Sequence, residues 1–203
     1  MSRLSKSGSA SAARVAEAAP KFTAPDRATL LHLAHDSILA ALEHRQLDLK
    51  APTPHLGEPR GVFTTLYLYG DLRGCVGYPL PIAPLYRAVA ETARAAGFDD
   101  PRFSPVTKPE AEHLAVSLSV LSPLEPIRAE DVEVGYHGLV VTAGKRRGLL
   151  LPQVPIEQHW DRTTFLEETC RKAGLHKDAY LHDATLQAFT AEIFNDPGTK
   201  ESR

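Results

Sequence analysis

Gly70-Asp71-Leu72-Arg73-Gly74-Cys75-Val76-Gly77-Tyr78 follows a run of apolar, β-branched and aromatic residues at 62–69, and we expect the rest of the chain to be arranged around it. Gly-Asp is a common two-residue turn, so we predict an antiparallel hairpin that turns at the first two residues of the stretch. In that register Leu66 lies opposite Cys75, and Arg73 and Cys75 share the face that carries Leu66. The sequence therefore predicts a thiol and a guanidinium close together on an apolar face.

Glycines stand on both sides of the thiol. Gly74 and Gly77 weaken a strand interior, and such glycines are useful where another backbone or a ligand approaches closely. A cation beside a thiol favours the thiolate, so Arg73 would activate Cys75. The alternative is that Cys75 is a buried structural residue and that the glycines only serve the twist of the sheet.

The loop at 98–106 carries two acids and one arginine between aromatic residues. A guanidinium on an apolar face needs a partner, and Asp99 and Asp100 are the nearest candidates for Arg73. The composition is typical of a functional loop, but a plain turn held by a pair between an aspartate and Arg102 would look the same.

The overall composition is that of an ordinary soluble globular protein, with 43% hydrophobic and 24% charged residues in a chain of 203. The net charge of −2 gives no electrostatic signal for nucleic acid or for an anionic membrane. No apolar run reaches the ~20 residues of a membrane helix. The two cysteines lie far apart without a clear secretory signal, so we expect free thiols and a cytoplasmic protein.

The two ends of the chain differ from its middle. Residues 1–22 are rich in Ser and Ala and lack apolar periodicity, so we expect a disordered N-terminal tail that folding does not need. A single domain is expected over 23–195, followed by a polar C-terminal tail at 196–203.

Helical patterns with clear start signals occur near both ends of the expected domain. A capping box at Thr23 begins an amphipathic helix that we predict to run to about Leu47. A later helix begins at Asp161 or Thr163 and carries Cys170 on its apolar face. Cys170 is therefore predicted to be a buried structural residue.

Strands are expected in hairpins rather than in successive βαβ units. Apart from the first hairpin, alternation predicts a strand at 114–120, a hairpin at 139–151 and one last strand at 185–194. This order favours an α+β fold with a largely antiparallel sheet flanked by helices. No Walker A, Rossmann, HExxH or CxxC motif is present, so we expect neither a cofactor nor a metal site.

Several motifs occur in one order that closely resembles the AMMECR domain family. They are Leu72-Arg73-Gly74-Cys75-Val76-Gly77, Asp100-Pro101-Arg102-Phe103-Ser104-Pro105-Val106, Ser119-Val120-Leu121-Ser122-Pro123 and Gly148-Leu149-Leu150-Leu151-Pro152-Gln153-Val154. The resemblance extends from about Arg27 to Phe194. It implies a main antiparallel sheet and a smaller second lobe, with the Arg-Gly-Cys stretch lining a groove between them.

The resemblance also implies partners, although it assigns no biochemical activity. Bacterial and archaeal members look like the protein A component of AmmeMemoRadiSam systems, which also contain a Memo-like protein and a radical SAM protein. In one respect this chain departs from the family pattern: members typically have a Glu in the strand before Ser-Val-Leu-Ser-Pro, where this chain has Ser117.

Two functions remain open in the sequence, with a metal-linked or redox role alongside partners as a third. In a thiol-dependent enzyme, Cys75 is the nucleophile or thiol acid/base, Arg73 stabilises it, and His137 or His159 is the base. In a non-catalytic module, the same groove binds a small molecule or a protein. The candidate ligand-binding residues are Gly74, Gly77, Asp100, Arg102, Gln153 and His159. A thiol that reacts much faster at Cys75 than at Cys170 would favour the enzyme.

Overall fold

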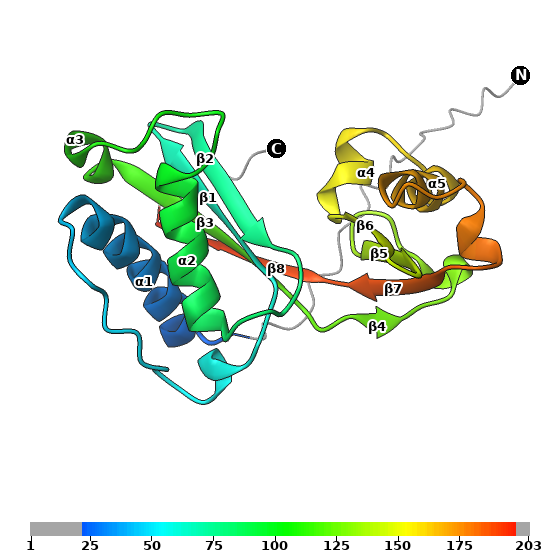
Figure 1. The fold of residues 1–203 in the computed structure, drawn as a ribbon, viewed down its shortest axis with the longest axis horizontal. Coiled ribbons are helices and arrows are strands. Elements are labelled where there is room, and N and C mark those ends of the chain that lie inside the picture. Colours follow the sequence, from blue (N-terminus) through cyan, green and yellow to red (C-terminus); the bar gives the residue numbers. More distant parts are fainter. Residues whose placement is uncertain (1–21, 198–203) are drawn as a thin grey trace, which may run out of the picture.

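A computed structural model describes residues 22–197 and confirms an α+β fold. Its strands form two four-stranded antiparallel sheets, each with helices against it (Figure 1). No helix in these residues is both long and apolar enough to cross a membrane. The expected tail at 1–22 lies almost wholly outside the described residues. Phe22, its last residue, is buried against the first hydrophobic core.

The first sheet contains the predicted hairpin and has the strand order β2-β1-β3-β8. Its strands are β1 (Val62–Leu68), β2 (Asp71–Tyr78), β3 (Leu114–Leu121) and β8 (Ala191–Asn195). Helices α1 (Ala24–Leu42) and α2 (Leu85–Phe98) cover one face of this sheet (Figure 1). The first core therefore lies between these helices and the side chains that point toward them from all four strands.

The first helix begins as predicted and ends earlier than predicted. Thr23 and Asp26 form the expected capping box at its start. The helix ends at Leu42 rather than near Leu47, because His44 takes a left-handed conformation with φ of 56° and the chain leaves the helical path.

The second sheet has the strand order β4-β7-β5-β6 and is covered on one face by α5 (Arg162–Lys172). Its strands are β4 (Glu125–Pro126), β5 (Gly138–Ala143), β6 (Arg146–Leu150) and β7 (Thr185–Phe189). Asp161 caps α5 through the Thr164 N–H, and Cys170 on this helix is fully buried, as predicted. The short helices are α3 (Lys108–Ala111), α4 (Gln153–Glu157) and 3-10 turns at His55–Gly57, Ala129–Asp131 and Ala179–Leu181.

Two segments pass between the sheets at one crossing point. The single strand predicted at 185–194 is in fact two strands, since β7 ends at Phe189 in the second sheet and β8 begins at Ala191 in the first. Beside it, β3 passes to β4. The Thr190 N–H donates to the Ser122 hydroxyl over 2.9 Å, and the Ser122 N–H donates to the Thr190 carbonyl over 2.8 Å. These bonds fix the position at which both segments change sheets.

A third apolar cluster joins the faces of the two sheets that α1, α2 and α5 do not cover. Its buried members are Leu121 from β3, Val140 from β5 and Phe189 from β7. Phe63 on β1 and Leu149 on β6 pack against it. The two sheets therefore make apolar contact near the crossing point.

Candidate functional site

The hairpin that carries Cys75 forms, but in a different register from the predicted one. Leu68 pairs with Asp71, so the turn residues are Tyr69 and Gly70, both with positive φ (54° and 93°). Cys75 pairs with Thr65 rather than with Leu66. The prediction was wrong because a left-handed Tyr is uncommon, so the residue types pointed to the next pair as the turn.

The corrected register moves the thiol to the opposite face of the sheet. Leu66 packs in the core beneath α2, whereas Thr65 and Cys75 lie on the face turned away from α1 and α2. The Thr65 hydroxyl donates to Cys75 Sγ over 3.3 Å. Thr65 also pairs with Ser117 on β3, so a thiol and two hydroxyls form one row across three strands. We call Cys75, Thr65 and Ser117 the thiol row.

The two glycines of the hairpin have different neighbours. A Cβ at Gly74 would lie 2.1 Å from the Ala96 carbonyl oxygen, so Gly74 permits close contact with the backbone of α2. A Cβ at Gly77 would lie 2.2 Å from the ring of Phe63. We expected these glycines to admit either another backbone or a ligand, and at Gly74 it is the backbone of α2 that comes close.

Arg73 is directed to a different partner from those predicted. It is the extra residue of a β-bulge, since Leu66 pairs with Gly74 and the next residue of β1 pairs with Leu72. Its Nε and Nη2 donate to the Glu110 carboxylate over 3.0 and 3.2 Å. Asp99 and Asp100, the predicted partners, pair instead with other arginines.

The bidentate pair with Arg73 lowers the pKa of Glu110 to about 2, and N–H and O–H donation from Thr107 contributes. Arg73 Nη1 is buried without a hydrogen-bond partner among the described residues. The guanidinium therefore ties the hairpin to the start of α3, and no hydrogen bond joins it to Cys75 in the part of the chain that is described.

Asp100 and Arg102 both form hydrogen bonds with the backbone of Cys75. The Asp100 carboxylate, only 3% exposed, accepts the Cys75 N–H over 2.9 Å, and Arg102 Nη2 reaches the Cys75 carbonyl oxygen over 3.4 Å. Arg102 also pairs with Asp100 over 2.7 Å. The Arg102 guanidinium, together with the backbone N–H groups of Cys75 and Arg102, holds the pKa of Asp100 well below its usual range. The loop at 98–106 therefore contains the Asp–Arg pair that was one of the two expectations. Because β2 is an edge strand, this pair bonds to backbone groups of Cys75 that a neighbouring strand would otherwise bond.

The predicted bases belong to the other sheet. His137 directly precedes β5, and its ring accepts the Glu133 N–H at Nδ1 over 3.0 Å. Burial lowers the pKa of His137. Gln153 begins α4, and His159 follows that helix in an exposed position. Within residues 22–197, none of these three side chains makes a hydrogen bond with Cys75.

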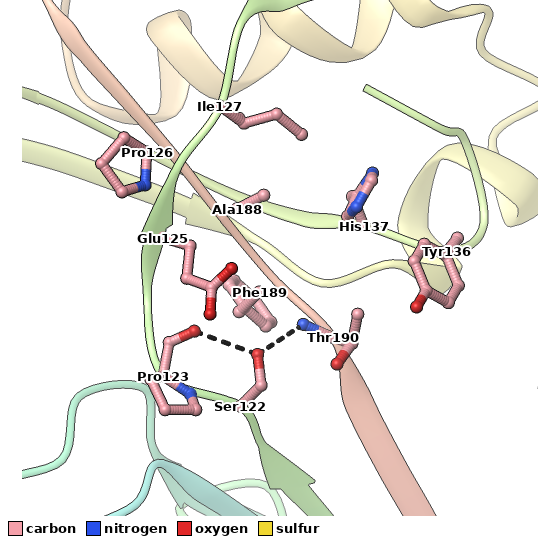
Figure 2. A pocket seen from close by; sticks show the side chains of 10 residues that line it. All are labelled: Ser122, Pro123, Glu125, Pro126, Ile127, Tyr136, His137, Ala188, Phe189 and Thr190. Carbon is pink, nitrogen blue, oxygen red and sulfur yellow. Dashed lines mark hydrogen bonds between the residues drawn. The ribbon is translucent and has the colours of Figure 1, made fainter. Parts of the chain in front are cut away.

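His137 instead lines a pocket of about 330 Å³ beside the crossing point (Figure 2). No local sequence pattern indicates this pocket, because its walls come from three segments that meet only in the fold. Thr65 was also missed, since its place next to Cys75 follows from the true register. Nowhere in the described part of the chain do three or more His, Cys, Asp or Glu side chains gather in a way that could hold a metal ion.

Two antiparallel sheets with a thiol-bearing hairpin define this as an α+β protein with a candidate site on the first sheet. The family model described as AMMECR1 matches residues 31–194. The chain belongs to the AMMECR1 family, as its motifs predicted.

Relatives are similar over most of the chain. Protein MK0488 of Methanopyrus kandleri is 42% identical over 188 residues, which cover 87% of this chain and 91% of the relative. A protein of Aquifex aeolicus is 38% identical over 177 residues, covering 82% and 91%. The crystal structure of uncharacterized protein PH0010 from Pyrococcus horikoshii matches with a TM-score of 0.70 and 42% identity, over 86% of this chain and 93% of that one.

Proposed function

We propose that this protein binds a small polar ligand at the thiol row, on the face of the first sheet that α1 and α2 leave uncovered. The observation that carries the proposal is the bond from Thr65 to Cys75 Sγ in a row that continues to Ser117. Strands hold these groups at fixed spacing, and a site on strands is more precise than one on loops. Hydroxyl and thiol groups both donate and accept, so they suit a ligand with several polar atoms.

The hydrogen bonds of Asp100 and Arg102 with the Cys75 backbone support the same proposal. A buried carboxylate at Asp100 and a guanidinium at Arg102 fix one peptide unit of an edge strand. Arg102 is itself 55% exposed, so it retains N–H groups for a ligand at the end of the row. Preorganisation of this kind lowers the entropy cost of binding.

Binding is favoured over turnover by what surrounds the thiol. Arg73 is engaged by Glu110, and no histidine or carboxylate among the described residues bonds to Cys75 Sγ. A thiol-dependent enzyme is the second candidate, because the Cys75 thiol lies on an open sheet face, accepts a hydrogen bond from Thr65 and has the exposed Arg102 guanidinium beside its backbone.

Disulfide-bearing fragments test the binding proposal. The full chain is equilibrated with a fragment set under partial reduction, and the adducts are read by intact mass. We expect Cys75 to retain a few fragments strongly, Cys170 to remain unmodified, and both Ser117→Val and Arg102→Gln to weaken retention. Thr163→Ala, which removes an exposed hydroxyl from α5, is the matched control. Equal retention of all fragments on Cys75 would overturn the proposal.

The alkylation rate of Cys75 separates the two candidates. If iodoacetamide labels Cys75 near neutral pH faster than it labels a free cysteine, and Thr65→Val slows the reaction, the enzyme is favoured. If Cys75 labels no faster than a free cysteine while fragments are still selected, the binding module is favoured.

The proposal includes the partners and the compartment that the sequence implies. Family membership supports a Memo-like protein and a radical SAM protein as partners, and two unpaired cysteines support a cytoplasmic location. Light scattering of mixtures with each purified partner tests the first point, and a complex that survives Cys75→Ala would place the contact elsewhere.

A further inference from the structure

We infer a second ligand site, independent of the thiol row, in the pocket beside the crossing point, and we assign to it a compound with a primary ammonium group next to a carbonyl. The pocket measures about 330 Å³, at the low end of the roughly 300–1,000 Å³ range of small-molecule sites. Its walls are the segment from Ser122 to Ile127, the residues directly before β5, and the end of β7.

The pocket has a fixed frame. Ser122 and Thr190 are joined by two hydrogen bonds, and the Ser122 hydroxyl donates further to the Pro123 carbonyl oxygen over 3.0 Å. On the other side, the ring of Tyr136 packs edge-on against His137 with centroids 4.8 Å apart. The cavity is therefore held by the strands that exchange sheets, and it does not depend on a loop alone.

The negative side of the pocket is Glu125. Its carboxylate is directed into the space enclosed by the labelled side chains in Figure 2. Within the described ranges it has neither an ion pair nor a hydrogen bond. The apolar groups of Ile127, Ala188 and Phe189 lie around it. Glu125 is exposed, and an unpaired carboxylate with apolar side chains beside it suits a ligand that carries a cation next to an apolar group.

The other side of the pocket offers donors. Because His137 Nδ1 accepts the Glu133 N–H, the neutral ring carries its proton on Nε2. The Tyr136 hydroxyl has no partner among residues 22–197 and provides a second O–H group. Donors across from a carboxylate suit a ligand whose ammonium is followed closely by an oxygen acceptor. Free amino acids and peptide N-termini share this chemistry.

The test uses the full chain labelled with nitrogen-15 and titrated with L-leucinamide. We expect amide signals around the pocket to shift, including those of Glu125, Gly138 and Thr190. N-acetyl-leucinamide, which lacks the ammonium, should bind about tenfold or more weakly, because the pair with the carboxylate is lost. Equal binding of the two compounds, or the absence of shifts at millimolar leucinamide, would overturn the inference.

Variants localise the effect. Glu125→Gln should raise the Kd for leucinamide about tenfold or more while leaving the rest of the spectrum in place, and Tyr136→Phe should raise it by a smaller factor. The control is Glu157→Gln, which removes an exposed carboxylate from α4. An unchanged Kd in Glu125→Gln would overturn the assignment of the cation to Glu125.

The source of the ligand follows from two further probes. Tighter binding of L-leucine than of leucinamide supports a free amino acid whose carboxylate meets the donors, whereas tighter binding of leucyl-glycine amide supports a peptide N-terminus. Because the thiol row contributes nothing to these titrations, Cys75→Ala should leave them unchanged, and the two proposals can fail separately.

Discussion

In each of the two sheets a glycine lies directly beneath the backbone of a covering helix. A Cβ at Gly74 would lie 2.1 Å from the Ala96 oxygen of α2, and a Cβ at Gly148 would lie 2.6 Å from the Thr169 oxygen of α5. The covered faces therefore use the same device, which brings helix and strand closer than any side chain allows.

The other faces of the two sheets differ. In the first sheet this face carries the thiol row, whereas in the second it carries Val140, Leu149 and Phe189 of the cluster at the crossing point. The first sheet also contributes Leu121 and Phe63 to this cluster near the crossing point, but farther along the same face it carries the polar thiol row. The two larger apolar cores lie on the covered faces, and in the thiol row Cys75 and Thr65 are half-buried while Ser117 is buried, so a ligand would reach the row from the side of Cys75.

The largest effects should come from the paired glycines. Gly74→Ala and Gly148→Ala should each lower the free energy of unfolding by about 3 kcal/mol or more, because the new methyl group meets helix backbone that cannot move aside. Urea unfolding measures both. Gly57→Ala is the control, since its Cβ would have ordinary contact at 3.7 Å from Ala51. If either variant lost less unfolding free energy than Gly57→Ala, the close contact between that glycine and its helix would not matter for stability.

Much of this fold was predictable from local patterns. The capping box at Thr23, the alternation in β3 and the apolar face of α5 are signals carried by neighbouring residues; β3 and α5 formed where expected, and α1 began where expected although it ended earlier. The site was less predictable. The residue types made Cys75 a candidate and indicated the Asp–Arg turn, but the hydrogen-bond partner of Cys75 depends on the register of the hairpin.

The predicted register of the hairpin was wrong because two departures from regular strand geometry occur within five residues. Tyr69 turns in the left-handed region, and Arg73 is bulged out of the ladder. Neither is signalled by residue preference, since tertiary contacts such as the pair between Arg73 and Glu110 stabilise them. The break at Thr190 was missed for a similar reason, because alternation continues through it while the chain changes sheets.

Carboxylates give the next largest contrast between the sheets. Glu110→Gln should lower the free energy of unfolding by about 2 kcal/mol, because it leaves the Arg73 guanidinium, which is only 11% exposed, without its counter-ion. In the second sheet the matched change Glu168→Gln on α5 should cost less than about 0.5 kcal/mol, because its partner Arg171 is 52% exposed. Similar costs for the two variants would remove the contrast.

The pH dependence of stability checks the same pair. The folded pKa of Glu110 is about 2 against an ordinary value of 4.5, so its contribution is complete above the ordinary pKa and is lost as the pH falls toward 2. The difference in Tm between the protein and Glu110→Gln should therefore shrink in acid. A difference that stays constant down to the folded pKa would contradict the assignment.

Cys170→Ala should lower the free energy of unfolding by about 1 kcal/mol, through the cavity left in the core of the second sheet. Its side chain is fully buried, and burial raises the pKa of the thiol, so the native protein should also resist iodoacetamide at this position. Rapid labelling of Cys170 before unfolding would show that α5 opens from the sheet.

The smallest change in stability should come from Cys75→Ala, which contrasts directly with Cys170→Ala. Cys75 is only partly buried and its sulfur accepts one hydrogen bond, from Thr65, whose hydroxyl can turn to water when the sulfur is removed. The change should therefore alter the free energy of unfolding by less than about 0.5 kcal/mol, within the range of ordinary surface substitutions. Denaturation of both cysteine variants under one set of conditions measures the contrast. A cost at Cys75 equal to that at Cys170 would mean that the thiol row is part of the packing that holds the first sheet, and a ligand role for that face would lose its basis.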